Sequence, residues 1–125
     1  MWIEYNANPD GRRTNDCTIR AICKLTGKSW DEIHCDTFVV AHAMRDMQEA
    51  NRVWGRYLRM NGYKRHALPD DCPDCYTVRE FCADHPHGKY MLALDGHVVA
   101  VEDGNYYDTW DSGNETAIYY WKKEV

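Results

Sequence analysis

The chain has 125 residues, with 15 Lys and Arg against 20 Asp and Glu, so its formal net charge is −5; this length is typical of one domain, spanning 1–125. The negative charge argues against a nucleic-acid-binding protein, which normally carries a basic surface, and against binding to an anionic membrane. No apolar run approaches the roughly 18 residues of a membrane-spanning helix, and the first ten residues lack the apolar core of a signal peptide. We therefore expect a cytoplasmic protein whose six cysteines are reduced and serve as packed side chains, metal ligands or catalytic groups.

The part of the chain over about 14–85 is predicted to be mainly helical, after a loop marked by the turn residues at 8–11. The first helix should cover 16–26, where four residues recur with helical spacing: Ile19, Ile22, Cys23 and Thr26. Thr14, Asn15 or Asp16 can cap its start, and Gly27 is a good stop.

Two capping boxes mark further helix starts. Ser29 and Glu32 open a helix that keeps its apolar spacing to about Gln48. Thr77 and Glu80 open a short helix that must stop before Pro86. Between them, 51–61 is predicted to be helical and 63–76 to be a connection.

From about 89 to 122 the apolar period changes to two, which indicates strands. Strands are expected at 89–94, 97–102, 105–110 and 117–121, with Asp103-Gly104 as a hairpin turn. Helices followed by an antiparallel meander predict an α+β fold, with N-terminal helices packed on a C-terminal antiparallel sheet.

Cys17 and His97 are the candidates for chemistry. Cys17 falls in the first turn of the first helix, where unpaired N–H groups and the helix dipole stabilise a thiolate and lower the thiol pKa. Taken alone, each residue is better explained by packing than by chemistry. Together they would form one half of a cysteine–histidine nucleophilic site.

The hairpin register supplies a third group. If Asp103-Gly104 is a two-residue loop, His97 and Asp108 become diagonal neighbours on one face of the sheet. A carboxylate there would fix the imidazole tautomer and support the imidazolium. A three-residue loop would instead bring Asp111 opposite His97. The Asp-Gly pair favours the two-residue turn, and hence Asp108.

In this order the sequence resembles the papain-like cysteine peptidase superfamily, above all its compact bacterial or phage members. The resemblance rests on three short segments, Asn15-Asp16-Cys17, His97 to Val101 and Asp108-Thr109-Trp110. It implies a papain-like fold, with Cys17 as nucleophile, His97 as general base and acid, Asp108 as the orienting group and Trp110 shielding the His97–Asp108 contact. It also implies a peptide or protein substrate and no cofactor.

The chain departs from that family around the oxyanion. No glutamine precedes the cysteine, because the only one is Gln48. The Cys17 backbone N–H and the Asn15 side chain are the candidate oxyanion donors, unless Asn15 only caps the helix. The expected activity is cleavage of a peptide, isopeptide or other amide bond through a thioester. A non-catalytic interaction module of the same fold is the alternative.

A zinc-stabilised binding domain is a further alternative. One CxxC and one CxxH supply four ligands suited to tetrahedral zinc: Cys72, Cys75, Cys82 and His85. A helix starting at Thr77 would carry Cys82 roughly 10 Å from Cys75, at 1.5 Å per residue, which argues against closing the four onto one ion. The preferred interpretation has no metal site.

Overall fold

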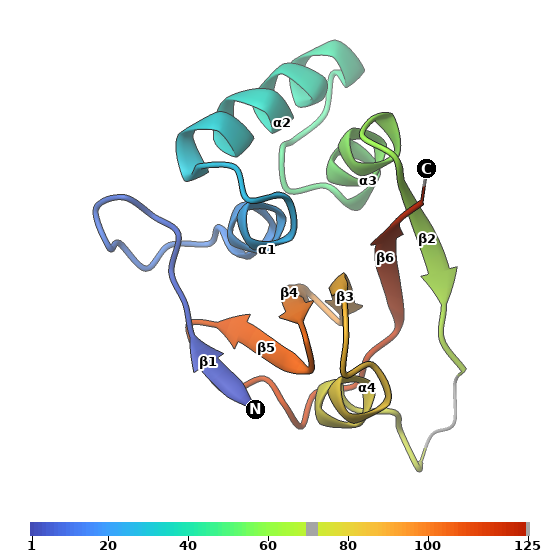
Figure 1. The fold of residues 1–125 in the computed structure, drawn as a ribbon. Helices are drawn as coiled ribbons and strands as arrows, with labels where there is room; N and C mark the ends of the chain where they lie inside the picture. The colour runs from blue at the N-terminus through green and yellow to red at the C-terminus, as the bar shows by residue number, and fades with distance from the viewer. Residues whose placement is uncertain (70–72, 125) are drawn as a thin grey trace.

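The computed structural model describes residues 1–69 and 73–124, and within these it has an α+β fold of four helices and a six-stranded mixed sheet (Figure 1). The helices are α1 (Cys17–Thr26), α2 (Trp30–Met44), α3 (Asn51–Met60) and α4 (Val78–Asp84). The strands are β1 (Trp2–Glu4), β2 (Tyr63–Ala67), β3 (Lys89–Leu94), β4 (His97–Glu102), β5 (Asn105–Asp108) and β6 (Tyr119–Lys123).

The helix starts follow their capping signals. Ser29 and Glu32 form the predicted capping box at α2, and the Thr77 side chain accepts a hydrogen bond from the Glu80 backbone N–H at α4. The second helix is shorter than predicted. It ends at Met44 because Arg45 takes a left-handed backbone conformation (φ 53°), which closes the last turn.

The sheet runs in the order β1-β5-β4-β3-β6-β2. β1 pairs in parallel with β5, and all other pairs are antiparallel. The prediction of helices first and a purely antiparallel sheet last is therefore wrong in two places. β1 lies in the expected N-terminal loop, and β2 lies in the segment expected to connect two helices. Both are edge strands, whose partners come 50 or more residues later in the chain.

The central strands are buried on both faces, which explains their nearly continuous apolar sequence. Helices α1, α2 and α3 cover one face and α4 covers the other (Figure 1). Along β3, Met91 and Ala93 face the three-helix side, whereas Tyr90, Leu92 and Leu94 face α4. This packing holds the N-terminus of α1 against the end of β4 at which His97 begins the strand.

Within the described residues, no helix is both long and apolar enough to cross a membrane.

Candidate active site

Cys17 lies in the first turn of α1, as predicted; it is the first residue of the helix, and its side chain is half-buried. Asp16 occupies the N-cap position, but its side chain makes no capping hydrogen bond. Its carboxylate is bound instead by Arg20 and by the Trp30 indole N–H, at 2.9 Å from the latter. The Asp16 carboxylate therefore does not cap the backbone N–H groups in the first turn of α1, where the Cys17 thiol lies.

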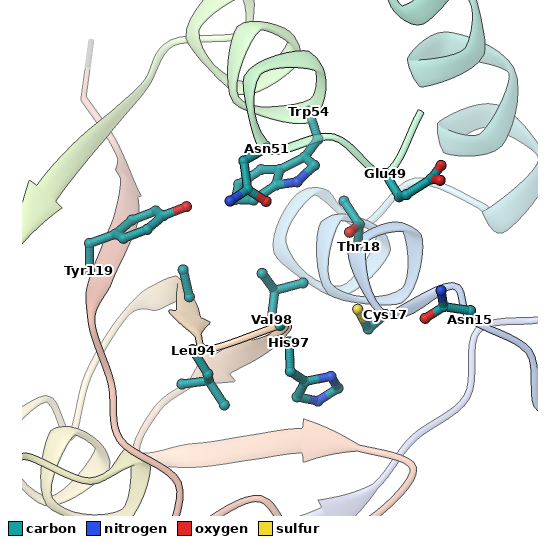
Figure 2. A pocket seen from close by; sticks show the side chains of 12 residues that line it. Asn15, Cys17, Thr18, Glu49, Asn51, Trp54, Leu94, His97, Val98 and Tyr119 are labelled. Atoms are coloured by element: carbon teal, nitrogen blue, oxygen red, sulfur yellow. The ribbon is translucent and has the colours of Figure 1, made fainter. Parts of the chain in front are cut away.

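The Cys17 sulfur points toward the beginning of β4 and a pocket above it (Figure 2). Two hydrogen bonds reach it, one with the His97 side chain and one with the backbone of Val98. A backbone N–H can only donate, so the Val98 bond favours the thiolate over the thiol. The predicted Cys17–His97 contact is therefore present in the structure.

The opposite side of the His97 ring meets Asp108. His97 Nε2 lies 2.6 Å from Asp108 Oδ2, which leaves Nδ1 for the contact with Cys17. Asp108 is buried, and its carboxylate also accepts hydrogen bonds from the Ser112 hydroxyl and the Thr109 backbone N–H, both at 2.8 Å. These bonds fix the carboxylate and hence the plane of the imidazole.

The two-residue hairpin turn is confirmed, because Glu102 pairs with Asn105 across Asp103 and Gly104. Asp111, the alternative third member, lies elsewhere. It forms a salt bridge with Arg79 and accepts a hydrogen bond from the Tyr106 hydroxyl. The structure therefore brings Asp108, and not Asp111, to His97.

The electrostatics of the pair favour charge separation. Burial is the largest effect on Cys17 and raises its pKa, but the hydrogen bonds with His97 and Val98 and the charges of His97 and Arg20 outweigh it, so that the net pKa is lowered. Burial also lowers the His97 pKa, yet the hydrogen bonds with Asp108 and Cys17 outweigh it and raise the pKa to about 9. Both shifts favour a thiolate beside an imidazolium over a neutral thiol beside a neutral imidazole.

The buried free cysteines away from this site show the opposite behaviour. Burial raises the pKa of Cys23 to about 12 and that of Cys82 to about 11. Both are therefore inert thiols at physiological pH. The contrast shows that the specific contacts of Cys17, and not burial, decide the direction of its pKa shift.

A buried ion network binds the Asp108 oxygen that does not contact His97. Arg20 is 6% exposed and bridges two buried carboxylates, forming salt bridges with Asp16 and with Asp108 Oδ1 at 3.4 Å. Arg20 could not be recognised from the sequence, because a cation four residues after an acid is usually part of an exposed ion pair on a helix. Only the position of Asp108, 88 residues later, makes it a component of the site.

Trp110 and Asn15, the other two residues predicted for the site, lie close to His97 and Cys17 respectively. The Trp110 ring lies against the His97 ring, with 5.1 Å between their centroids, although it is past the end of β5 and 42% exposed. Asn15 lines the pocket beside Cys17 (Figure 2) and does not cap α1. The amide N–H groups of Gln48 are used in the α2 region, where they donate to the His34 carbonyl and the Thr37 hydroxyl.

The pocket beside Cys17 and His97 has a volume of about 180 Å³ (Figure 2). α3 and β6 supply its far walls, which sequence analysis did not assign to the site. Its lining combines apolar and polar side chains, among them Leu94, Trp54, Asn51, Tyr119 and Glu49. It is large enough for a few atoms of an acyl group, and a longer substrate would extend beyond it.

The zinc alternative does not fit the described donors. Cys75 is held in a disulfide, which corrects the expectation that all six cysteines are reduced and removes a thiolate from the set. Cys82 is buried in α4, and His85 Nδ1 donates to the Phe81 carbonyl at 2.9 Å. Cys72 lies outside the described residues. Among the residues that the structure describes, no three His, Cys, Asp or Glu side chains are grouped as metal ligands.

Comparison with known proteins gives no relative: no family model, curated protein or solved structure matches this chain.

Proposed function

We propose that this protein is a cysteine-dependent hydrolase of the papain-like type, which cleaves a peptide, isopeptide or other amide bond. The proposal rests on one observation above all. A half-buried cysteine at a helix N-terminus, a histidine and a buried aspartate form a continuous hydrogen-bonded chain at the edge of a pocket. Such a chain is what nucleophilic catalysis by a thiol requires.

The first half-reaction forms a thioester. The Cys17 thiolate attacks the substrate carbonyl carbon, and the carbonyl π electrons move onto oxygen. The Cys17 backbone N–H and the Asn15 amide are the donors for that oxyanion. His97 Nδ1–H then protonates the amide nitrogen, the carbon–nitrogen bond breaks and the amine leaves. His97 is neutral at this point, with its tautomer held by Asp108.

The second half-reaction restores the enzyme. Neutral His97 removes a proton from a water molecule as the water oxygen attacks the thioester carbonyl. The tetrahedral intermediate collapses, the carbon–sulfur bond breaks, and the electron pair returns to sulfur as the thiolate. The product is a carboxylic acid, and His97 is again an imidazolium beside Cys17. An amine acceptor in place of water would give acyl transfer by the same steps.

The arrangement of the elements supports a papain-like fold. α1 carries the nucleophile at its N-terminus and packs against β4, which begins with the histidine, while the next strand, β5, ends at the aspartate. The chain lacks a glutamine before the cysteine, which many members of that superfamily have, so the proposal concerns the reaction class and leaves the acyl acceptor open.

An activated ester tests the proposal without knowledge of the substrate. We expect p-nitrophenyl acetate to acetylate Cys17, with a burst of p-nitrophenolate followed by slow turnover, as measured by absorbance and by mass spectrometry of the trapped protein. Cys17→Ser should lose the burst, whereas Cys35→Ser, which removes an exposed thiol, should keep it. Equal acetylation of the wild type and Cys17→Ser would contradict the proposal and favour a non-catalytic binding module.

A further inference from the structure

One segment that supplies part of the pocket wall is rich in positive charge, although the protein as a whole is acidic. Residues 51–67 contain no Asp or Glu but five of the 15 basic residues, in a chain whose net charge is −5. This segment comprises α3 and β2. The five are Arg52, Arg56, Arg59, Lys64 and Arg65.

Two of these arginines lie over aromatic side chains of β6, one at the pocket and one further along the strand. Tyr119, whose side chain lines the pocket with His97, has the Arg65 guanidinium over its ring at 4.0 Å. Trp121, two residues further along the same face of β6, has the Arg59 guanidinium over its ring at 5.1 Å. We call Arg65 and Arg59, with the two rings that support them, the arginine track.

Neither arginine is neutralised. Among the ion pairs and side-chain hydrogen bonds of residues 1–69 and 73–124, none involves Arg59 or Arg65. Both side chains are on exposed residues. Stacking on an aromatic ring holds the guanidinium plane while leaving its N–H edge available, and that edge binds a carboxylate with two parallel hydrogen bonds.

Further positive charge lies on the opposite face of the same part of the sheet. β2 and β6 also place Lys64 directly opposite Lys122, a like-charge pair that disfavours the sheet. That pair lies on the other face, because residues that alternate along a strand point to opposite sides. Positive charge at this end of the sheet is thus present on both faces, but only the arginine track is continuous with the pocket.

We propose that the arginine track binds an acidic, extended segment of a polypeptide substrate whose scissile amide lies at Cys17; this inference rests on the proposed function. Tyr119 and Trp121 are two residues apart on a strand, a spacing of roughly 6.6 Å at about 3.3 Å per residue. An extended peptide repeats its side chains at the same interval. Carboxylates at alternate positions of the substrate would therefore meet Arg65 and Arg59 in turn.

A short acidic peptide fits better than a nucleic acid. The track offers two guanidiniums in a row, and the net charge of −5 repels a long polyanion. The two guanidiniums of the arginine track are enough to bind two carboxylates of a peptide. A peptide also contains the amide bonds on which the reaction proposed at Cys17 acts.

The test measures binding separately from catalysis, in the Cys17→Ser protein. Two ten-residue peptides with an uncharged fluorophore are compared by fluorescence anisotropy, one with alternating Glu and Gly and one with alternating Gln and Gly. We expect the Glu peptide to bind at least tenfold more tightly. Adding R59Q and R65Q should remove that preference. Adding K64Q and K122Q, which removes the same total charge from the other face of β2 and β6, should change the affinity less than twofold.

Three results would overturn the inference: no preference for the Glu peptide, equal losses in the two double variants, or competition by a short RNA at the same concentration as by the Glu peptide. Because Arg59 lies against buried Trp121, R65Q alone repeats the test if the double variant does not fold, with an expected loss of at least threefold. Binding in the Cys17→Ser protein needs no turnover. Its absence would leave the hydrolase proposal intact, and an unreactive Cys17 would leave the binding result intact.

Discussion

Arg20 and Asp108 lie 88 residues apart in the chain, yet Arg20 Nη2 approaches Asp108 Oδ1 to 3.4 Å and both side chains are buried. This contact joins α1, which carries Cys17, to the end of β5, which orients His97. Arg20 also binds Asp16, so two buried carboxylates share one cation; Asp16 precedes Cys17 in the chain, and Asp108 binds His97. The site is therefore held by an ion network beneath it as well as by the hairpin.

Removing Arg20 should destabilise the protein strongly. Arg20→Met leaves two buried carboxylates without their cation, a change that typically costs about 3–5 kcal/mol. Urea unfolding measures it, with Arg13→Gln as the control. Arg13 pairs with Glu4 at 2.9 Å on the surface, and loss of such a pair costs less than about 1 kcal/mol. Equal losses in the two variants would show that the Arg20 network is not a stabilising element.

Asp108 and Asp111 offer a matched pair of substitutions. Asp108→Asn removes the charge that supports the His97 imidazolium, so the His97 pKa falls and less thiolate is present at neutral pH. The alkylation rate of Cys17 should drop by about tenfold for each unit by which the pair's pKa shifts. Asp111→Asn removes the same charge from a carboxylate bound to Arg79, and the rate should stay unchanged. A comparable loss in both variants would contradict the assignment of Asp108.

Asn15 should matter for acylation and not for alkylation. Attack on an ester carbonyl creates an oxyanion, whereas displacement of iodide from iodoacetamide does not. Asn15→Ala should therefore slow acetylation of Cys17 by p-nitrophenyl acetate by roughly a hundredfold, the usual effect of losing one oxyanion donor. Its alkylation rate should match the wild type. Equal slowing of both reactions would indicate that Asn15 affects the thiol itself.

The Cys17–His97 pair should also change how stability depends on pH. Between the ordinary pKa of histidine, about 6.5, and that of a thiol, about 8.5, the folded wild type with Cys17 as thiolate holds one proton on His97, whose pKa is raised to about 9. In the same range the unfolded chain holds one proton on Cys17. The proton counts are equal, so the pair adds no slope.

In Cys17→Ser, Asp108 still raises the His97 pKa, although the part of the shift that came from Cys17 is lost. The folded state of the variant therefore keeps the His97 proton to a higher pH than its unfolded state does. The stability of this variant should therefore fall as pH rises through that range. Its difference from the wild type should grow by up to about 1.4 kcal/mol per pH unit. Urea unfolding at pH 6.5, 7.5 and 8.5 measures this difference, in which the other histidines cancel. Parallel stability curves would mean that Cys17 and His97 do not titrate as a pair.

Local signals in the sequence predicted much of the candidate site. Asp103-Gly104 determines a two-residue turn, and that turn alone determines which aspartate reaches His97. The capping boxes located the starts of α2 and α4. These features are short-range, so they can be recognised without knowing the fold.

The features that escaped prediction depend on long-range contacts. β1 has three residues and becomes a strand only by pairing with β5, about 100 residues later. β2 shows no apolar alternation because it is an edge strand, exposed along most of its length. Arg20 became part of the site only through burial against Asp108, and α3 supplies a pocket wall only because it packs beside β6. No local pattern encodes these pairings.

The most direct test of the central claim is the pH–rate profile for alkylation of Cys17 by iodoacetamide, a neutral reagent, read residue by residue with mass spectrometry. Exposed Cys35 serves as an internal reference. We predict that Cys17 reacts rapidly well below the ordinary thiol pKa of about 8.5, and that His97→Ala abolishes this advantage. A Cys17 that titrates like an ordinary thiol, or whose rate does not depend on His97, would contradict the activated pair and with it the proposed hydrolase.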